Sequence, residues 1–259
     1  MSDVLLVTSR DPFCGISCHS DMLMEAVKQA DPTLSIEASA EALNPLAVSV
    51  SLARTPPVIL LNYHRALHSR WVPEHVEMFK GIGHKIVIIF HDTFGERPPD
   101  DLTLRLHDLA DAFIVHEPCE GLPKAIYWRQ GVPDREVEVR ATGHSHRPYI
   151  GSIGHDFPWK NYPLLCRTAA EMGWGVLLCV PAMSDERDAE LRAENRWLSV
   201  QRGLSAEKAL LVLRECDATA FTYVCANSGT SAAIRFGIGA WKPVIAFSTC
   251  RQHRDLLAD

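Results

Sequence analysis

Short apolar runs rich in β-branched residues alternate with longer amphipathic stretches along almost the whole chain. This alternation is typical of a parallel sheet whose strands are each followed by a helix. The expected strands are 3–8, 58–62, 85–90, 112–116, 149–153, 175–180, 197–201, 217–222 and 243–247. The expected helices are 19–30, 73–81, 100–109, 161–172, 185–194, 205–214 and 229–239. Because the strand runs are continuously apolar, both faces of each sheet should be covered, and the predicted fold class is α/β.

A segment rich in turn-forming residues, 140–152, separates two such series of strands and helices. We therefore place a domain boundary near residue 147, which predicts Rossmann-like domains over 1–146 and 147–259. The segment 31–57 is ambiguous, because its Ala and Ser content favours a helix while prolines punctuate its ends. Few residues follow the last expected strand, so the second domain is either compact or truncated at its C-terminus.

The composition narrows the class of protein. The chain has 259 residues, and its longest apolar runs are far shorter than the roughly 20 residues of a membrane-spanning helix. The N-terminus lacks the basic residues and apolar length of a signal peptide, so we expect a cytoplasmic protein. The eight cysteines lack the paired spacing of zinc sites, and we expect them to be reduced. The net charge of −6 disfavours nucleic acid as a partner.

The segment 218–247 carries the most informative chemistry. A strand ends near Val224, and after a short polar loop a helix begins. The free amides and the positive dipole at a helix start bind anions well, so this loop is a candidate diphosphate site. Ordinary capping of the helix by a loop hydroxyl is the alternative. The candidate anion-binding residues are Asn227, Ser228, Gly229, Thr230 and Ser231.

Two strands end in a histidine followed by an acid. A buried strand ends with His91 and Asp92, at the carboxyl edge where open α/β sheets bind their ligands. An imidazole there can donate a hydrogen bond to a sugar hydroxyl or stabilise charge near a reacting carbon. A histidine that merely caps the strand end is the alternative. His116 and Glu117 end another strand in the same way and are second-rank candidates at the same edge.

Gly15 and Lys160 also follow predicted strands. Gly15 either allows the backbone to approach a phosphate or sugar closely, or makes the turn into the following helix. Lys160 supplies a mobile ammonium that can neutralise charge on a departing diphosphate. A solvent-exposed lysine at a helix start is the alternative.

We expect neither a metal site nor a cofactor. His64 and His68 lie four residues apart, and His144 and His146 lie near the expected domain boundary. Neither pair has a cysteine or a carboxylate at ligand spacing. The sequence also contains no P-loop and no GxSxG motif.

These segments together resemble GT-B glycosyltransferases, in particular the retaining, nucleotide-sugar-dependent group that includes glycosyltransferase family 4. The resemblance lies in 218–247 with its closing KPVIA, in FPWKNYPLL at 157–165, in CGISCHSDML at 14–23 and in the HD step of 85–94. It implies two Rossmann-like domains facing a cleft. It further implies that Lys160 contacts the donor diphosphate and that the histidine of the HD step reaches the donor sugar.

The sequence departs from the family pattern near the predicted donor site. Common retaining members carry two glutamates around the loop corresponding to 228–236, where this chain has Ser228, Arg235 and Phe236. The arginine that often precedes the loop lysine is also absent. The resemblance favours retention at the anomeric carbon, and these departures leave the stereochemical outcome open.

The resemblance implies metal-independent transfer of a sugar from a UDP- or GDP-linked donor to an acceptor hydroxyl on a glycan or lipid-linked sugar. His91, Asp92 and Lys160 are then the catalytic residues, and Gly15, Lys160 and the loop after Val224 bind the donor. One alternative is a nucleotide-sugar 2-epimerase that uses Asp92 and Glu117. The others are a non-catalytic sugar-nucleotide-binding protein and a viral-type enzyme that glycosylates DNA bases. The sequence does not indicate an oligomeric state.

Overall fold

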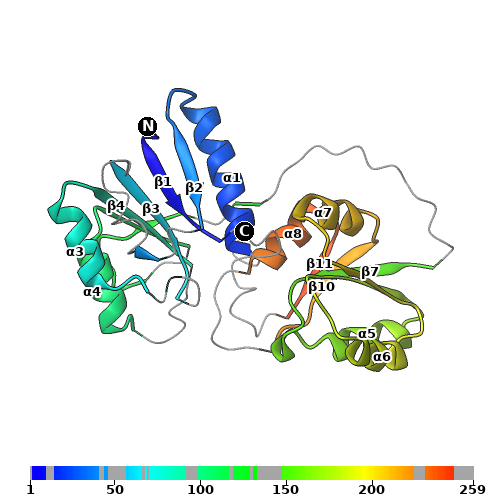
Figure 1. Ribbon diagram of the computed structural model, residues 1–259. Helices are drawn as coiled ribbons and strands as arrows, with labels where there is room; N and C mark the ends of the chain where they lie inside the picture. The colour runs from blue at the N-terminus through cyan, green and yellow to red at the C-terminus, as the bar shows by residue number, and fades with distance from the viewer. Residues whose placement is uncertain are drawn as a thin grey trace. The chain divides into compact units, whose positions relative to one another are not determined.

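Two parallel β-sheets organise the structure, one in each of two units of the chain (Figure 1). The computed structural model describes residues 2–9, 15–40, 44–45, 57–65, 68, 70–91, 98–116, 119–128, 131–132, 147–224 and 231–247. The described residues before Gly131 form the first unit, and those from Gly131 onward form the second.

The first unit is a parallel sheet with helices between its strands. Its strands are β1 (Val4–Val7), β2 (Ile36–Ser39), β3 (Val58–Tyr63), β4 (Lys85–Phe90), β5 (Ala112–Val115) and β6 (Ile126–Tyr127). Its described helices are α1 (Gly15–Ala30), α3 (Pro73–Gly81) and α4 (Asp101–Leu109). The strand order is β2-β1-β3-β4-β5-β6, and each neighbouring pair is parallel.

Helices cover both faces of this sheet. Successive side chains of a strand point to opposite faces, so neighbouring residues of β1 pack against different helices. Leu5 and Val7 of β1 pack in one cluster with Phe79 of α3. Leu6, which lies between them in the sequence, packs instead with Leu23 of α1. Burial on both sides explains why the strand sequences are continuously apolar.

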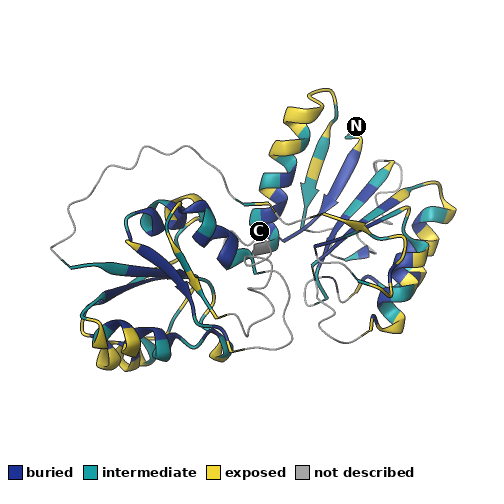
Figure 2. Ribbon diagram, turned by 180° about the vertical axis from the view of Figure 1, so that it is seen from behind, coloured by how far each residue is buried: buried dark blue, intermediate teal, exposed yellow. Residues whose placement is uncertain are grey.

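The second unit repeats the same architecture with five strands. They are β7 (Tyr149–Ile153), β8 (Gly175–Val180), β9 (Leu198–Arg202), β10 (Ala218–Phe221) and β11 (Val244–Ala246). The helices are the short 3₁₀ helix η3 (Pro158–Lys160), α5 (Tyr162–Glu171), α6 (Asp185–Glu194), α7 (Ala206–Arg214) and α8 (Ala232–Gly239). The strand order is β11-β10-β7-β8-β9, again with parallel pairs. Figure 2 shows the buried strands of both sheets beneath helices with exposed outer faces.

Two glycines allow helices to approach this second sheet closely. A Cβ at Gly151 of β7 would overlap the side chains of Leu213 and Cys216 beside α7. A Cβ at Gly237 of α8 would overlap the ring of Phe221 in β10. The absence of a side chain at both positions therefore sets how near α7 and α8 lie to the strands.

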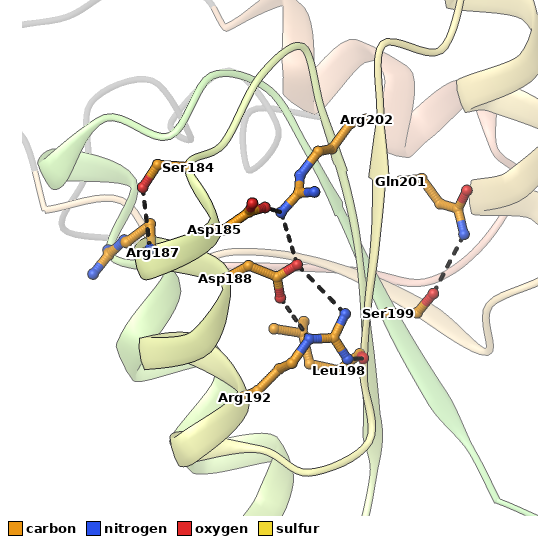
Figure 3. A network of polar contacts seen from close by, with 9 residues as sticks. All are labelled: Ser184, Asp185, Arg187, Asp188, Arg192, Leu198, Ser199, Gln201 and Arg202. Atoms are coloured by element: carbon orange, nitrogen blue, oxygen red, sulfur yellow. Dashed lines mark hydrogen bonds and ion pairs between the residues drawn. The ribbon is translucent and has the colours of Figure 1, made fainter.

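Because Leu191 is the buried residue of α6, this helix has little apolar packing, and polar contacts hold it against β9. Asp188 pairs with Arg192 one turn further along α6, at 2.6 Å between Oδ1 and Nε. Its other oxygen pairs with Arg202 of β9 at 2.8 Å (Figure 3). Partly exposed ion pairs contribute only about 0.2–1 kcal/mol each, so this network fixes the position of α6 more than it adds stability.

Each sheet has one topological switch point, at which the order in which strands are added to the sheet reverses direction. This point lies between β1 and β3 in the first unit and between β7 and β10 in the second. Open α/β sheets bind ligands at the carboxyl ends of the strands beside such a point. The loops that follow these strands are therefore where a site is expected.

The observed elements agree with the α/β fold predicted from the sequence, with three differences. The strand β2 lies inside the ambiguous segment 31–57, and β6 is a two-residue strand whose side chains are exposed. The helix α1 begins at Gly15 rather than at residue 19. The expected start was too late because the first residues of the helix lack the apolar period of the rest. The boundary near residue 147 stays a prediction, since residues 133–146 lie outside the described residues.

None of the helices in the described part of the chain combines the length and the hydrophobicity that crossing a membrane requires.

Asn195 connects three segments of the second unit and is only 1% exposed. Its Nδ2 donates to the carbonyls of Cys166 (3.2 Å) and Trp174 (3.1 Å), and its Oδ1 accepts from the Trp197 amide (2.9 Å). Asn195→Asp places a carboxylate against two carbonyl oxygens, so we expect a loss of about 3 kcal/mol in the free energy of unfolding. Urea denaturation measures it, with Gln201→Glu as the control for an amide-to-acid change near the surface. Wild-type stability of the Asn195→Asp protein would contradict this role.

The burial of His68 in the first unit predicts that the folded protein loses stability in acid. Burial lowers the pKa of His68 to about 4, against 6.5 for an ordinary histidine. Between these values the unfolded chain binds a proton that the folded chain does not, so stability falls as the pH drops from 6.5 towards 4. The full loss is on the order of 3 kcal/mol. We expect His68→Asn, which keeps an acceptor for the His64 amide, to flatten this slope in urea denaturation at several pH values. An unchanged slope would exclude His68 as the cause.

Candidate functional site

Lys160 lies at the carboxyl edge of the second sheet and is 4% exposed. It ends the 3₁₀ helix η3, which follows β7. Its Nζ donates to the hydroxyl of Tyr223 at 2.9 Å and to the carbonyl of Ile153 at 3.3 Å. Both acceptors are neutral oxygens, which orient the ammonium without adding a negative charge. The alternative of a solvent-exposed lysine is wrong, because the side chain is buried.

Gly154 makes room for this ammonium. Its φ of +127° lies in the region that favours glycine, and a Cβ at this position would fall on Nζ of Lys160. Backbone conformation and close approach therefore both require glycine at the end of β7. This role is not evident from the sequence, because a glycine after a strand usually indicates only a turn.

Hydrogen bonds fix the lysine loop to the segment that follows β10. The Thr222 hydroxyl lies 2.9 Å from the carbonyl of Lys160 and 3.1 Å from that of Asn161. The Val224 amide donates to the carbonyl of Trp159 at 2.8 Å. The loops after β7 and β10, which are neighbouring strands, are thus held together as one rigid edge.

Tyr223 connects the lysine to the start of α8. Its hydroxyl, which accepts from Lys160, lies 3.4 Å from Oγ of Ser231. Ser231 is the N-cap residue of α8, and its side chain caps no amide of that helix. The positive end of the helix dipole therefore lies beside a buried ammonium, an arrangement that favours an anion.

The structure brings two of the predicted donor-binding residues together, namely Lys160 and Ser231. The others of that loop lie outside the described residues: Asn227, Ser228, Gly229 and Thr230. Their proposed contacts with a diphosphate stay predictions.

In the first unit, His91 follows β4 and is oriented by Asn62 of β3. The Nδ2 of Asn62 donates to the carbonyl of Ile16 (3.0 Å) and to Oγ of Ser20 (2.6 Å). With its nitrogen fixed in this way, Asn62 presents Oδ1 to His91, and Nε2 of His91 donates to it. The Nδ1 of His91 therefore carries the lone pair.

Two further histidines lie against His91. The ring centroids of His91 and His116 are 4.7 Å apart, and His19 of α1 lies 4.7 Å from His91 and 5.3 Å from His116. The Nδ1 of His116, which follows β5, donates to the carbonyl of Trp128 at 2.8 Å. We call His19, His91 and His116 the trihistidine cluster.

Two histidines of this cluster, His19 and His91, favour their neutral forms. Burial, followed by the nearby His116, lowers the pKa of His19 to about 4. Burial, followed by His19 and His116, holds the pKa of His91 well below its ordinary value. Neutral imidazoles offer nitrogen lone pairs, so the cluster is chemically suited to hydrogen-bond donors or to metal ions.

The other predicted residues of the first unit are only partly described. Gly15 is the first residue of α1, about one turn before His19. Asp92 and Glu117 lie outside the described residues. His19 lies in the second turn of α1 and Asn62 lies near the end of β3, and neither was among the residues singled out from the sequence.

No protein-family model matches the sequence, and a search of curated proteins also gives no match. Among solved structures, AviGT4, a glycosyltransferase involved in avilamycin A biosynthesis, is similar with a TM-score of 0.62 at 13% identity, over 100% of this chain and 82% of that one. Anabaena HepE, solved in complex with UDP, has a TM-score of 0.60 at 13% identity, over 98% of this chain and 82% of that one.

The pneumococcal O-GlcNAc transferase GtfA, solved with UDP and GlcNAc, has a TM-score of 0.55 at 12% identity. The match covers 76% of this chain, which spans 43% of the length of that protein. The shared feature is a pair of parallel sheets, each with its own helices. The chain therefore has the GT-B fold, with two Rossmann-like α/β domains as in these structures.

Proposed function

We propose that this protein is a glycosyltransferase that moves a sugar from a nucleotide-diphosphate sugar to an acceptor hydroxyl. One observation carries the proposal: the ammonium of Lys160 is buried beside the start of α8, at the strand edge where such sheets bind ligands. The GT-B fold supports it, although a fold by itself does not define a reaction, so the argument rests on the chemistry of this edge.

That chemistry suits a leaving nucleotide diphosphate. Negative charge grows on the diphosphate as the bond to the sugar breaks, and donors already aimed at it stabilise the transition state. We assign the positive charge to Lys160 and the amides and hydroxyls to the start of α8, beginning with Ser231 and the loop before it. The residues of that loop are Asn227, Ser228, Gly229 and Thr230. The diphosphate then needs no metal ion.

In the first unit, we assign the sugar and the acceptor hydroxyl to the edge after β4. His91 is oriented by Asn62 and is suited to hydrogen bonding with a hydroxyl, and Asp92 follows it in the chain. Gly15 at the start of α1 allows close approach of the backbone on the same side of the sheet. The acceptor class we propose is a glycan or a lipid-linked sugar.

The first donors to test carry uridine. HepE was solved in complex with UDP, and GtfA was solved with UDP and GlcNAc. GDP-linked sugars form the second set, because no contact among the described residues selects the base.

Lys160→Met is expected to weaken UDP binding about 10- to 100-fold while leaving the affinity for uridine unchanged. The reason is the loss of a charge-assisted hydrogen bond to the diphosphate, which is worth about 1.5–3 kcal/mol. Isothermal titration calorimetry measures both affinities, and Lys208→Met, at an exposed lysine of α7, is the control.

Incubation of the wild-type protein with radiolabelled UDP- and GDP-sugars tests the reaction itself. Slow donor hydrolysis, abolished in Lys160→Met, supports sugar transfer. Formation of an epimeric sugar nucleotide would indicate an epimerase, and binding without turnover would indicate a non-catalytic protein. Failure to bind any nucleotide diphosphate would overturn the proposal.

Gly154→Ala tests whether the position of the ammonium matters. The added methyl group would occupy the place of Nζ of Lys160, so we expect UDP binding to fall as it does in Lys160→Met. Gly173→Ala is the matched control, because Gly173 also has a positive φ (+73°) but open space around its Cβ position. Both variants strain the backbone, Gly154→Ala the more strongly, and only Gly154→Ala displaces the lysine. Equal UDP affinities of the two variants would refute the argument.

A further inference from the structure

We propose that His19, His91 and His116 bind a single divalent transition-metal ion, with Zn²⁺ as the favoured ion. The inference does not depend on the proposed sugar transfer, because it rests on the positions of three histidines and not on the binding of a nucleotide sugar. Of the histidine, cysteine and acidic residues in the described ranges, these three form the group with ligand atoms close enough to share an ion.

The topology of the first sheet brings the three histidines together. β4 and β5 are parallel neighbours, so His91 and His116, which follow them, lie at the same edge. His19 reaches that edge from the second turn of α1. One ligand atom of each residue lies within 4.8 Å of those of the other two.

The spacing of the rings fits tetrahedral coordination. With Zn–N distances of about 2.0–2.1 Å, three imidazoles around one ion have ring centres roughly 5 Å apart. The observed centroid distances are 4.7, 4.7 and 5.3 Å. The three rings are therefore spaced as three imidazoles around one ion would be.

Hydrogen bonds hold two of the rings in the form that a metal needs. His116 donates Nδ1–H to the carbonyl of Trp128, which leaves the lone pair on Nε2. His91 donates Nε2–H to Asn62, which leaves the lone pair on Nδ1. Metal-binding histidines characteristically donate their second ring nitrogen to a carbonyl or carboxylate oxygen in this way.

His19 supplies the third nitrogen. Its Nδ1 is buried and has no hydrogen-bond partner among the described residues. A buried polar atom without a partner is unfavourable, and a metal ion would satisfy it. The lowered pKa values in this cluster agree with neutral rings, which are the forms that coordinate metals.

The ligand set selects the class of ion. Three imidazoles favour zinc, copper, nickel or cobalt over magnesium and calcium, which prefer oxygen ligands. Three protein ligands leave a fourth tetrahedral position for water or a substrate hydroxyl. With the ion bound, a sugar or acceptor hydroxyl would meet this fourth position rather than the ring of His91.

The test is cobalt and zinc binding by the full chain without an affinity tag, after treatment with a chelator. We expect one Co²⁺ per chain with the intense visible absorption of a tetrahedral site, displaced by one equivalent of Zn²⁺. Zn²⁺ should also raise the thermal unfolding midpoint. His19→Gln and His116→Gln should each weaken binding at least about 100-fold, and Asn62→Ala about tenfold, because Asn62 orients His91 and His19 without binding the ion.

Two control proteins should keep wild-type affinity. His84→Gln replaces a histidine of the same unit outside the cluster, and the double variant His144→Gln/His146→Gln removes the pair near the expected domain boundary. Absence of the cobalt spectrum in the wild-type protein, or equal affinity in His116→Gln, would overturn the proposal. Metal binding is measured without nucleotide, and UDP binding with chelator present, so failure of one proposal is distinguishable from failure of the other.

Discussion

The parallel alignment of the strands is the constraint on which the rest of this structure depends. Each βα unit returns the chain to the same end of the sheet, so every strand of a unit finishes at one edge. Polar side chains that are scattered along the sequence are thereby collected without any local motif. In the second unit this places Tyr223 beside Lys160, which is 63 residues away in the sequence. In the first unit it places His116 beside His91.

The buried ammonium of Lys160 is a consequence of backbone shape as much as of side-chain chemistry. Gly154 lets Nζ lie against the backbone, while Tyr223 and Ile153 provide oxygens that orient it. Burying a charge is unfavourable unless partners compensate for it, and neutral oxygens compensate only in part. The helix start at Ser231 adds more positive potential. An anion bound at this edge would interact favourably with both the ammonium and the helix start.

Sequence reasoning was sufficient for the α/β fold and for residues directly after predicted strands. His91 could be singled out because a hydrophobic run defines where its strand ends, and Lys160 because the segment around it resembles the lysine-bearing loop of GT-B glycosyltransferases. Tyr223 and Asn62 could not, because their roles depend on which strands are neighbours in the sheet, and periodicity does not give strand order. His19 was hidden for another reason: the first turn of α1 lacks an apolar period, so the helix was expected to begin at His19 itself. The strand β6, short and exposed, offered no burial pattern at all.

The two sheet edges favour ligands of opposite charge, which the overall net charge of −6 does not indicate. The edge of the second unit combines an ammonium with a helix N-terminus, so it attracts anions. The edge of the first unit gathers three imidazoles, and burial favours the neutral form of His19 and His91, so this edge presents lone pairs that suit cations or hydroxyl protons. Charging those imidazoles would place like charges within about 5 Å of one another in a poorly solvated site, which is strongly unfavourable. Neutral rings are therefore the favoured form of His19 and His91, and their nitrogen lone pairs suit a cation or a hydroxyl proton.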